Sequence, residues 1–175
     1  ASLLALAACQ QQEAPKAAEP TPAPAPVAAE PAPAPAPVDD FASRFDSVLA
    51  GAHRSDENKA RDEFRRPRET LTFFGIGGGQ NVIEITPGGG WYTEVLAPLM
   101  KGQGQYTAAI IDPTKVENER AKAYYTKSNE EYRGKLAASP ELYGEAKVVE
   151  IDMKAPVFGE PGSADMVKVE LPRQI

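Results

Sequence analysis

Short apolar runs, separated by longer polar stretches of helical period, set the pattern of the chain beyond residue 80. Runs of this length, rich in β-branched and bulky apolar side chains and bounded by turn-forming residues, are typical of buried β-strands. Because polar helical stretches alternate with them, the pattern predicts βαβ units and a parallel sheet. The expected strands cover residues 81–86, 105–111, 147–151 and a fourth that begins with 164–167.

Helical spacing dominates the segments before and between these strands. In the first segment, Phe41, Phe45, Val48 and Leu49 fall on one helical face. Elsewhere, capping residues and glycines mark the expected ends, and aromatic residues such as Phe64, Tyr124 and Tyr132 are expected to turn inward. The expected helices cover residues 40–49, 55–64, 68–74, a segment starting at 91, the region 113–136 and a short helix at 139–144.

Together these elements predict an α/β chain with a Rossmann-like, doubly wound parallel sheet. The sheet is expected to be incomplete, with about the first three to four strands, and to be preceded by N-terminal helices. In such sheets helices cover both faces, and ligands bind in a crevice beyond the carboxyl ends of the strands.

The composition changes sharply in the first part of the chain. Residues 14–38 consist almost entirely of Ala, Pro and Glu, so they cannot bury enough apolar surface to offset their ordering entropy. They are expected to form a disordered linker biased towards polyproline II. The domain therefore spans about residues 39–175, and its expected partners do not include nucleic acid because the net charge of the chain is −6.

The apolar start of the chain ends in Leu6-Ala-Ala followed by Cys9. This matches the lipobox of bacterial lipoproteins, in which the cysteine is lipidated and becomes the mature N-terminus. We expect a partial signal peptide at 1–8, lipidation at Cys9, and a linker up to residue 38. The protein would then be anchored at the periplasmic face of the cell envelope, and Gln10 favours the outer membrane. The alternative is a buried free cysteine in an apolar helix.

The richest candidate for chemistry is the glycine turn that follows the first predicted strand. The strand carries Glu84 and ends in Thr86-Pro-Gly-Gly-Gly, and a helix begins at Trp91. A strand, a glycine turn and a helix in this order expose backbone N–H groups and let a ligand approach the main chain. A dinucleotide fits less well, because its fingerprint needs a small residue where Thr93 stands. A phosphate loop of the Gly-Lys-Ser/Thr type is absent from the sequence.

Two aspartates end the next two strands, Asp112 after the second and Asp152 after the third. In a doubly wound sheet these positions are expected to converge beside the glycine turn. A carboxylate at the second strand suits a ribose diol, because it accepts two hydroxyl hydrogen bonds, and one at the third suits a purine amino group. The alternative is ordinary turn chemistry at the end of each strand.

These residues resemble the class I S-adenosylmethionine-dependent methyltransferases, which carry an acidic residue before a G-x-G-x-G turn and further acidic residues after the second and third strands. Thr86 departs from the pattern, because it occupies the first glycine position. The segment Thr86-Pro-Gly-Gly-Gly-Trp-Tyr-Thr93 also looks like that of a poorly characterised group of exported bacterial methyltransferases. The resemblance implies S-adenosylmethionine as cofactor, no metal and an unknown methyl acceptor. The cofactor-binding residues it implies are Glu84, Thr86, Gly88, Gly89, Gly90, Asp112 and Asp152, and no catalytic residue can be named.

The end of the chain departs from this family. A complete methyltransferase sheet has seven strands, with the fourth at its centre, yet Lys168 and Glu170 would be buried there and Pro172 would end the strand. We therefore expect a fragment or an altered reading frame from about residue 168, carrying mainly the cofactor-binding half of a methyltransferase. The alternative for the strand is an edge position in a short domain. The alternative for function is a catalytically inactive, ligand-binding envelope lipoprotein.

Overall fold

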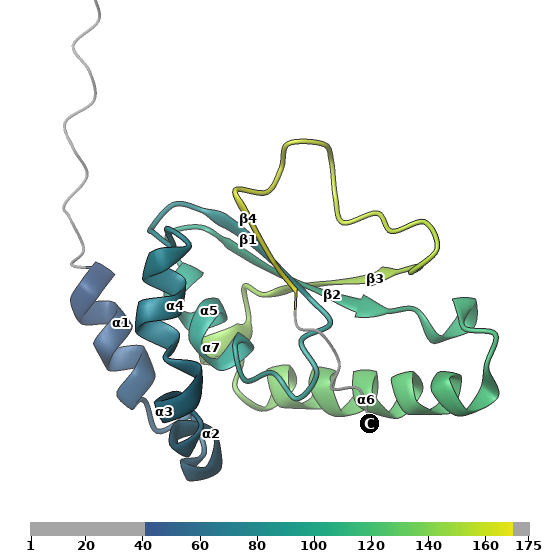
Figure 1. The fold of residues 1–175 in the computed structure, drawn as a ribbon, viewed down its shortest axis with the longest axis horizontal. Helices are drawn as coiled ribbons and strands as arrows, with labels where there is room; N and C mark the ends of the chain where they lie inside the picture. Colours follow the sequence, from purple (N-terminus) through teal and green to yellow (C-terminus); the bar gives the residue numbers. More distant parts are fainter. Residues whose placement is uncertain (1–40, 170–175) are drawn as a thin grey trace, which may run out of the picture. The chain divides into compact units, whose positions relative to one another are not determined.

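The computed structural model describes residues 41–169 (Figure 1). All of these residues belong to one compact unit. The predictions for the signal peptide, Cys9 and the linker lie outside the described residues. Among the helices of residues 41–169, none has the length and apolar character that a membrane span requires.

A four-stranded, all-parallel sheet forms the centre of the domain. Its strands are β1 (Asn81–Ile85), β2 (Gln105–Ile111), β3 (Lys147–Ile151) and β4 (Met166–Val169), arranged in the order β3-β2-β1-β4. The classic doubly wound fold begins with the same order, so the α/β topology is compatible with a Rossmann-like fold. The predicted parallel sheet is confirmed. Its first three strands lie within one residue of their expected positions, and the fourth begins two residues later than expected.

The helices follow the expected sequence of elements, with two differences. The predicted helix at 55–64 is split at Arg61, and the predicted region 113–136 is a short 3-10 turn followed by a separate helix. That helix begins after Asn118, whose side chain accepts a hydrogen bond from the N–H of Ala121 and so caps it. The helices are α1 (Phe41–Ala50), α2 (Asp56–Ala60), α3 (Asp62–Arg65), α4 (Pro67–Phe73), α5 (Thr93–Met100), η1 (Pro113–Lys115), α6 (Glu119–Ala138) and α7 (Pro140–Tyr143).

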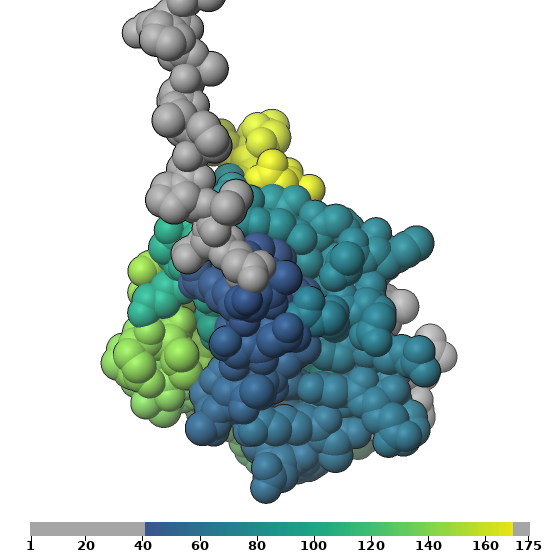
Figure 2. All heavy atoms as spheres, turned by 90° about the vertical axis from the view of Figure 1, so that its left-hand side faces the viewer, coloured from purple at the N-terminus to yellow at the C-terminus, as the bar shows by residue number. Residues whose placement is uncertain are grey.

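The main core lies between one face of the sheet and the helices (Figure 1). Alternate residues of the strands, such as Val82 of β1 and Ala108 of β2, point to this face because side chains alternate along a strand. The apolar helix α5 is buried along its whole length and packs on β1 and β2. Figure 2 views the end of the domain where α1 lies, and α1 packs against α5 through buried Phe45 and Val48.

The opposite face of the sheet carries a smaller apolar cluster. Ile83, Ala109 and Ile151 form it, and the connection from β3 to β4 covers it with Phe158 and Ala164. This connection, residues 152–165, contains no helix. Helices on both faces would make the sheet doubly wound, and that finer part of the fold stays a prediction.

Two aromatic residues do not point inward as expected. Phe64 is 82% exposed and Tyr124 is 63% exposed. Helix α3 has only four residues and ends at Arg66 in a left-handed conformation, so it does not continue the face that would bury Phe64. Helix α6 is 20 residues long, and its buried residues begin only at Asn129, so Tyr124 lies on the half that reaches beyond the core.

Candidate functional site

The glycine turn connects β1 to α5. It is fixed at both ends, because the N–H of Thr86 donates to the carbonyl of Ala109 at 2.9 Å and the N–H of Gly90 donates to that of Pro87 at 2.9 Å. Thr86 has a φ of +53°, a left-handed conformation that glycine adopts readily and a β-branched residue rarely does. Threonine therefore stands in the first glycine position with the backbone shape of a glycine, and it carries the strain that this implies.

The three glycines of the turn differ in why they lack a side chain. Gly88 and Gly90 have positive φ values of 56° and 77°. A Cβ on Gly90 would also lie 3.3 Å from both Tyr132 Cε2 and Lys135 Nζ. Gly89 has neither constraint, since its φ is not positive and a Cβ would meet no atom within 4 Å. The packing of the described residues thus gives no reason for a glycine at position 89, and its bare backbone is open to a ligand.

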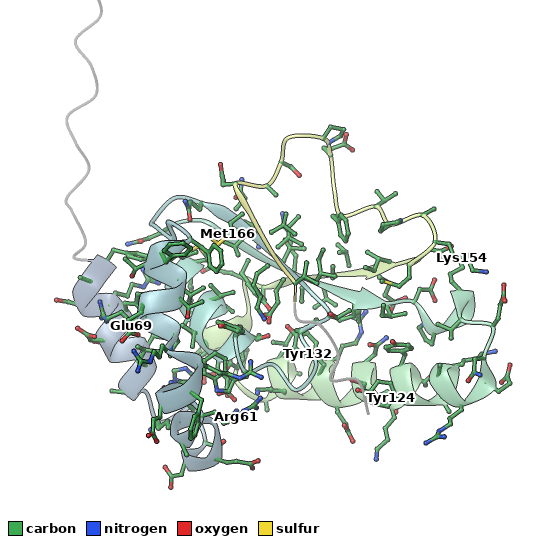
Figure 3. All side chains as sticks on the ribbon, viewed as in Figure 1. Arg61, Glu69, Tyr124, Tyr132, Lys154 and Met166 are labelled. Atoms are coloured by element: carbon green, nitrogen blue, oxygen red, sulfur yellow. The ribbon has the colours of Figure 1, made fainter. Side chains whose placement is uncertain are left out.

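A groove of about 440 Å³ lies between the glycine turn and α6. Figure 3 shows two of its aromatic residues, Tyr124 and Tyr132, both on α6. Within residues 41–169, the N–H groups of Gly88 and Gly89 donate no hydrogen bond. The groove is lined by Gly88, Gly89, Tyr124, Lys127, Ser128, Glu131, Tyr132 and Lys135.

The structure brings Asp112 and Asp152 together at the ends of neighbouring strands. Ile111 is in register with Ile151, and the N–H of Asp112 donates to the Ile151 carbonyl at 2.9 Å. Asp112 Oδ1 accepts from the N–H and hydroxyl of Thr114, at 2.8 and 2.7 Å. Those hydrogen bonds, the hydroxyl first, lower the pKa of Asp112.

Asp152 makes the same kind of turn, with Oδ1 accepting from the N–H of Lys154 at 2.8 Å. Both aspartates therefore stabilise the turn that follows their strand, as the alternative interpretation predicted. Within residues 41–169 their Oδ2 atoms accept no hydrogen bond, so each carboxylate also keeps one oxygen for a ligand.

Asp112 and Asp152 follow the last residues of β2 and β3. Ile85, the last residue of β1, is in register with Ala109, so β2 continues past the end of β1. Asp112 lies three residues beyond Ala109, which corresponds to about 10 Å along a strand. Neither Asp112 nor Asp152 lines the groove beside Gly88 and Gly89.

Glu84 is fully buried beneath the turn, on the helix-covered face of the sheet. Its Oε2 accepts hydrogen bonds from Thr93 Oγ1 at 3.0 Å and from the Tyr106 hydroxyl at 2.6 Å. The Tyr132 hydroxyl lies 3.1 Å from each of those two oxygens, so it donates to one of them. Glu84 therefore holds the first residue of α5 from inside the core, and it does not line the groove.

The two tyrosines of this network stay protonated. Burial, reinforced by the negative charge of Glu84, raises the pKa of Tyr106 and of Tyr132 well above the usual tyrosine value. A neutral phenol is a hydrogen-bond donor, so Tyr106 keeps the proton that it donates to the buried carboxylate, and Tyr132 keeps the one that it donates to Thr93 or Tyr106.

Lys168 was expected to be an isolated buried charge, and the structure corrects this. Its Nζ lies 3.5 Å from Glu84 Oε1 and 3.8 Å from the centre of the Tyr92 ring, and its side chain is 17% exposed. Within the described residues β4 pairs only with β1, so it lies at the edge of the sheet. Charged side chains that are partly exposed are normal on an edge strand. The lysine is thus compensated by an opposite charge and an aromatic face.

A second polar cluster near the turn was not predicted. Glu94 in the first turn of α5 is buried, and its carboxylate accepts from Lys135 at 2.6 Å and from Asn58 at 3.0 Å. Lys135 also donates to the Gly89 carbonyl at 2.9 Å, so α6 is tied to the turn. The sequence offered one signal: an acidic residue in the first turn of a helix interacts favourably with its dipole. The spacing of 41 residues between Glu94 and Lys135 gave no signal.

Arg54 belongs to the same cluster, because it lies close to Glu94 and pairs with Asp62. Its guanidinium is buried and forms a bidentate pair with Asp62, at 2.6 and 2.7 Å. Its Nε lies 3.8 Å from Glu94 Oε2. The N-terminal helices therefore support the start of α5 through charged groups as well as through apolar packing.

Within residues 41–169, no group of three or more His, Cys, Asp and Glu side chains is placed to hold a metal ion. Comparisons with protein-family models, with curated proteins and with solved structures gave no match. The site therefore has to be interpreted from its own geometry: an open backbone turn, a groove with cations and aromatic rings, and two carboxylates beyond it.

Proposed function

We propose that the chain carries the cofactor-binding half of an S-adenosylmethionine-dependent methyltransferase. The observation that carries the proposal is Gly89, which lines a groove although neither its backbone conformation nor the packing around it requires a glycine. A backbone left bare at the carboxyl end of β1, in a parallel sheet of this order, is where such folds bind nucleotide-like cofactors. When bound, S-adenosylmethionine supplies a methyl group on a positively charged sulfur.

The turn and the strand ends would divide the work of holding the cofactor. The backbone from Thr86 to Gly90 would contact it directly, as the resemblance implies. Asp112 would accept hydrogen bonds from ribose hydroxyls through Oδ2, and Asp152 would accept from the purine amino group. Glu84 would act indirectly, because its buried carboxylate holds Thr93 and so fixes the start of α5. Methyl transfer depends on positioning, which a rigid turn favours.

Calorimetric titration of the protein with S-adenosylmethionine and with NAD tests this proposal. We expect S-adenosylmethionine to bind, and Gly89→Ala to weaken its binding by roughly tenfold or more, because a methyl group would stand between backbone and ligand (1.4 kcal/mol is a factor of ten). Gly77→Ala is the matched control. Gly77 also has no positive φ and space for a Cβ, but it does not line the groove.

Two outcomes would contradict the proposal. Binding of NAD without S-adenosylmethionine would indicate a dinucleotide site. Equal weakening by Gly77→Ala would show that the Gly89 effect is not local to the groove.

The proposal includes a location in the cell. Lipidation of Cys9 would anchor the domain at the periplasmic face of the envelope, with the membrane as its partner and residues 9–38 as spacer. Mass spectrometry of the mature N-terminus tests this, and an unmodified Cys9 thiol in cells would exclude it.

A second candidate is a catalytically inactive binding module with the same fold. The observation that favours it is that polar groups beside the turn are bound internally: Lys135 to Glu94, and Tyr132 within the Glu84 network. His53, the one histidine of the sequence, donates to the backbone carbonyl of Glu94 at 2.8 Å. Binding of S-adenosylmethionine without transfer of a radiolabelled methyl group in an envelope extract would support this candidate.

A further inference from the structure

One face of α6 is turned towards the glycine turn and carries polar groups. Tyr124, Ser128, Glu131 and Lys135 follow one another at intervals of four, three and four residues, which places them on the same side of a helix. All four line the groove. The cofactor prediction does not use this face, because its residues come from the glycine turn and the ends of β2 and β3.

Lys135 is a cation held in a fixed position. Its ammonium donates to Glu94 at 2.6 Å and to the Gly89 carbonyl at 2.9 Å, and an ammonium has three N–H donors. One donor therefore remains, on a side chain that is 27% exposed and lines the groove. A group fixed before the ligand arrives loses little entropy on binding.

Further unused donors line the same groove. Within residues 41–169 the hydroxyl of Ser128 makes no hydrogen bond, and the same holds for the N–H groups of Gly88 and Gly89. Lys127 also lines the groove, and Glu131 lies 3.6 Å from it and balances its charge. Each cation of the lining has a carboxylate partner, Lys135 in Glu94 and Lys127 in Glu131, so it is the free N–H and O–H donors that suit an anion.

The groove also has an aromatic wall. The ring of Tyr124 is largely exposed and that of Tyr132 is held by its hydroxyl in the buried network, and both line the groove (Figure 3). Aromatic faces bind flat rings by offset or edge-to-face stacking. We propose that this groove binds a small molecule in which a carboxylate or phosphate is attached to a flat ring, with Lys135 and the Gly88–Gly89 amides at the anion and Tyr124 at the ring.

Titration of the isotope-labelled 175-residue chain, followed by NMR of its amides, tests the proposal. The probes are phenyl phosphate, benzoate and, as the neutral analogue, phenol. We expect phenyl phosphate or benzoate to shift the amides of Gly88, Gly89 and Ser128 in a saturable manner, and the comparison of the two identifies the preferred anion. Phenol should shift them far less, since it lacks the charge.

Two pairs of variants locate the site. Lys135→Gln should weaken binding by roughly tenfold, because it removes a charge-assisted hydrogen bond to the anion. Lys122→Gln is its control, a cation of the same helix outside the groove. Since Lys135 also supports the turn, Ser128→Asp provides a second test: it adds a repelling charge in the groove, and Thr126→Asp is its exposed control on the same helix.

The proposal fails if neither anion shifts these amides at millimolar concentration, if phenol binds as well as the anions, or if the controls weaken binding as much as the groove variants. S-adenosylmethionine, titrated into the same samples, keeps the two proposals apart. Its binding without the aromatic anions would overturn only the α6 groove. Binding of the anions without S-adenosylmethionine would overturn only the proposed cofactor.

Discussion

Thr86 is held in a conformation that its own side chain disfavours. The hydrogen bond from its N–H to Ala109 and the turn that follows fix its φ at +53°. In the glycine-rich pattern that the sequence resembles, a glycine stands at this position. The structure instead places the left-handed conformation on the threonine. Strain of this kind is typical of sites that hold a ligand and need a defined backbone shape.

Thr86→Gly should therefore stabilise the domain. Relief of the strained φ contributes about 1–3 kcal/mol, and the greater freedom of glycine in the unfolded chain costs about 1 kcal/mol, so we expect a net gain on the order of 1 kcal/mol. Chemical denaturation measures it. Thr86→Val keeps the β-branch and should show no gain, and a loss of stability in Thr86→Gly would show that the threonine side chain contributes more than its strain costs.

Helix α5 contains a proline that would usually disrupt it. Pro98 has no N–H, so the carbonyl of Glu94, four residues earlier, lacks its helical donor. His53 supplies the missing hydrogen bond through Nε2, at 2.8 Å. The role of this histidine therefore follows from the proline.

A double-mutant cycle tests this pairing. His53→Ala should destabilise the protein by about 1 kcal/mol, the usual net contribution of a hydrogen bond. In a Pro98→Ala background the same change should cost less than half as much, because the introduced alanine supplies its own N–H to the Glu94 carbonyl. Thermal or urea denaturation of the four proteins gives the coupling energy. Equal costs in both backgrounds would exclude the role we assign to His53.

The positions of the helices and strands could largely be predicted from the sequence. Which side chains they expose could not. The strand at 105–111 and the strand at 147–151 were predicted at their observed limits, because each is an apolar run bounded by turn residues. Phe64 was expected to be buried and is exposed, because the direction of a four-residue helix depends on packing that periodicity does not reveal.

Buried polar groups connect the glycine turn to most of the domain. Glu84 and its tyrosines join β1, β2, α5 and α6, while Glu94 joins α5 to α2 and α6. The sequence predicted Glu84 and the glycines through local spacing. It missed Glu94 and Lys135 because their contacts join distant segments, which local spacing does not reveal.

The buried tyrosines predict that the free energy of unfolding falls at alkaline pH. Burial raises the pKa of Tyr106, Tyr132 and Tyr143, to about 12 for Tyr143, whereas tyrosines in the unfolded chain have a pKa of about 10. Above pH 10 the unfolded chain releases protons that the folded protein retains, so the stability that is fully present below about pH 10 falls as the pH rises towards the folded pKa values.

Urea denaturation from about pH 8 to about pH 11.5, together with tyrosinate absorbance, measures this effect. We expect Tyr106, Tyr132 and Tyr143 to titrate at a higher pH in the folded protein than in the unfolded chain. Tyr106→Phe should remove part of the alkaline dependence. A stability that does not change above about pH 10 would show that these hydroxyls are not buried as described.

The ion pair between Glu84 and Lys168 also determines how an edge strand aligns. The two residues are direct partners across β1 and β4. If β4 slid by one residue, a valine would stand opposite Glu84 and the lysine would move to the other face of the sheet. A slide by two would bring either Met166 or the like-charged Glu170 to the buried carboxylate. A short strand that buries little apolar surface is thus kept in a single alignment, because every other alignment leaves a negative charge in the core without its cation.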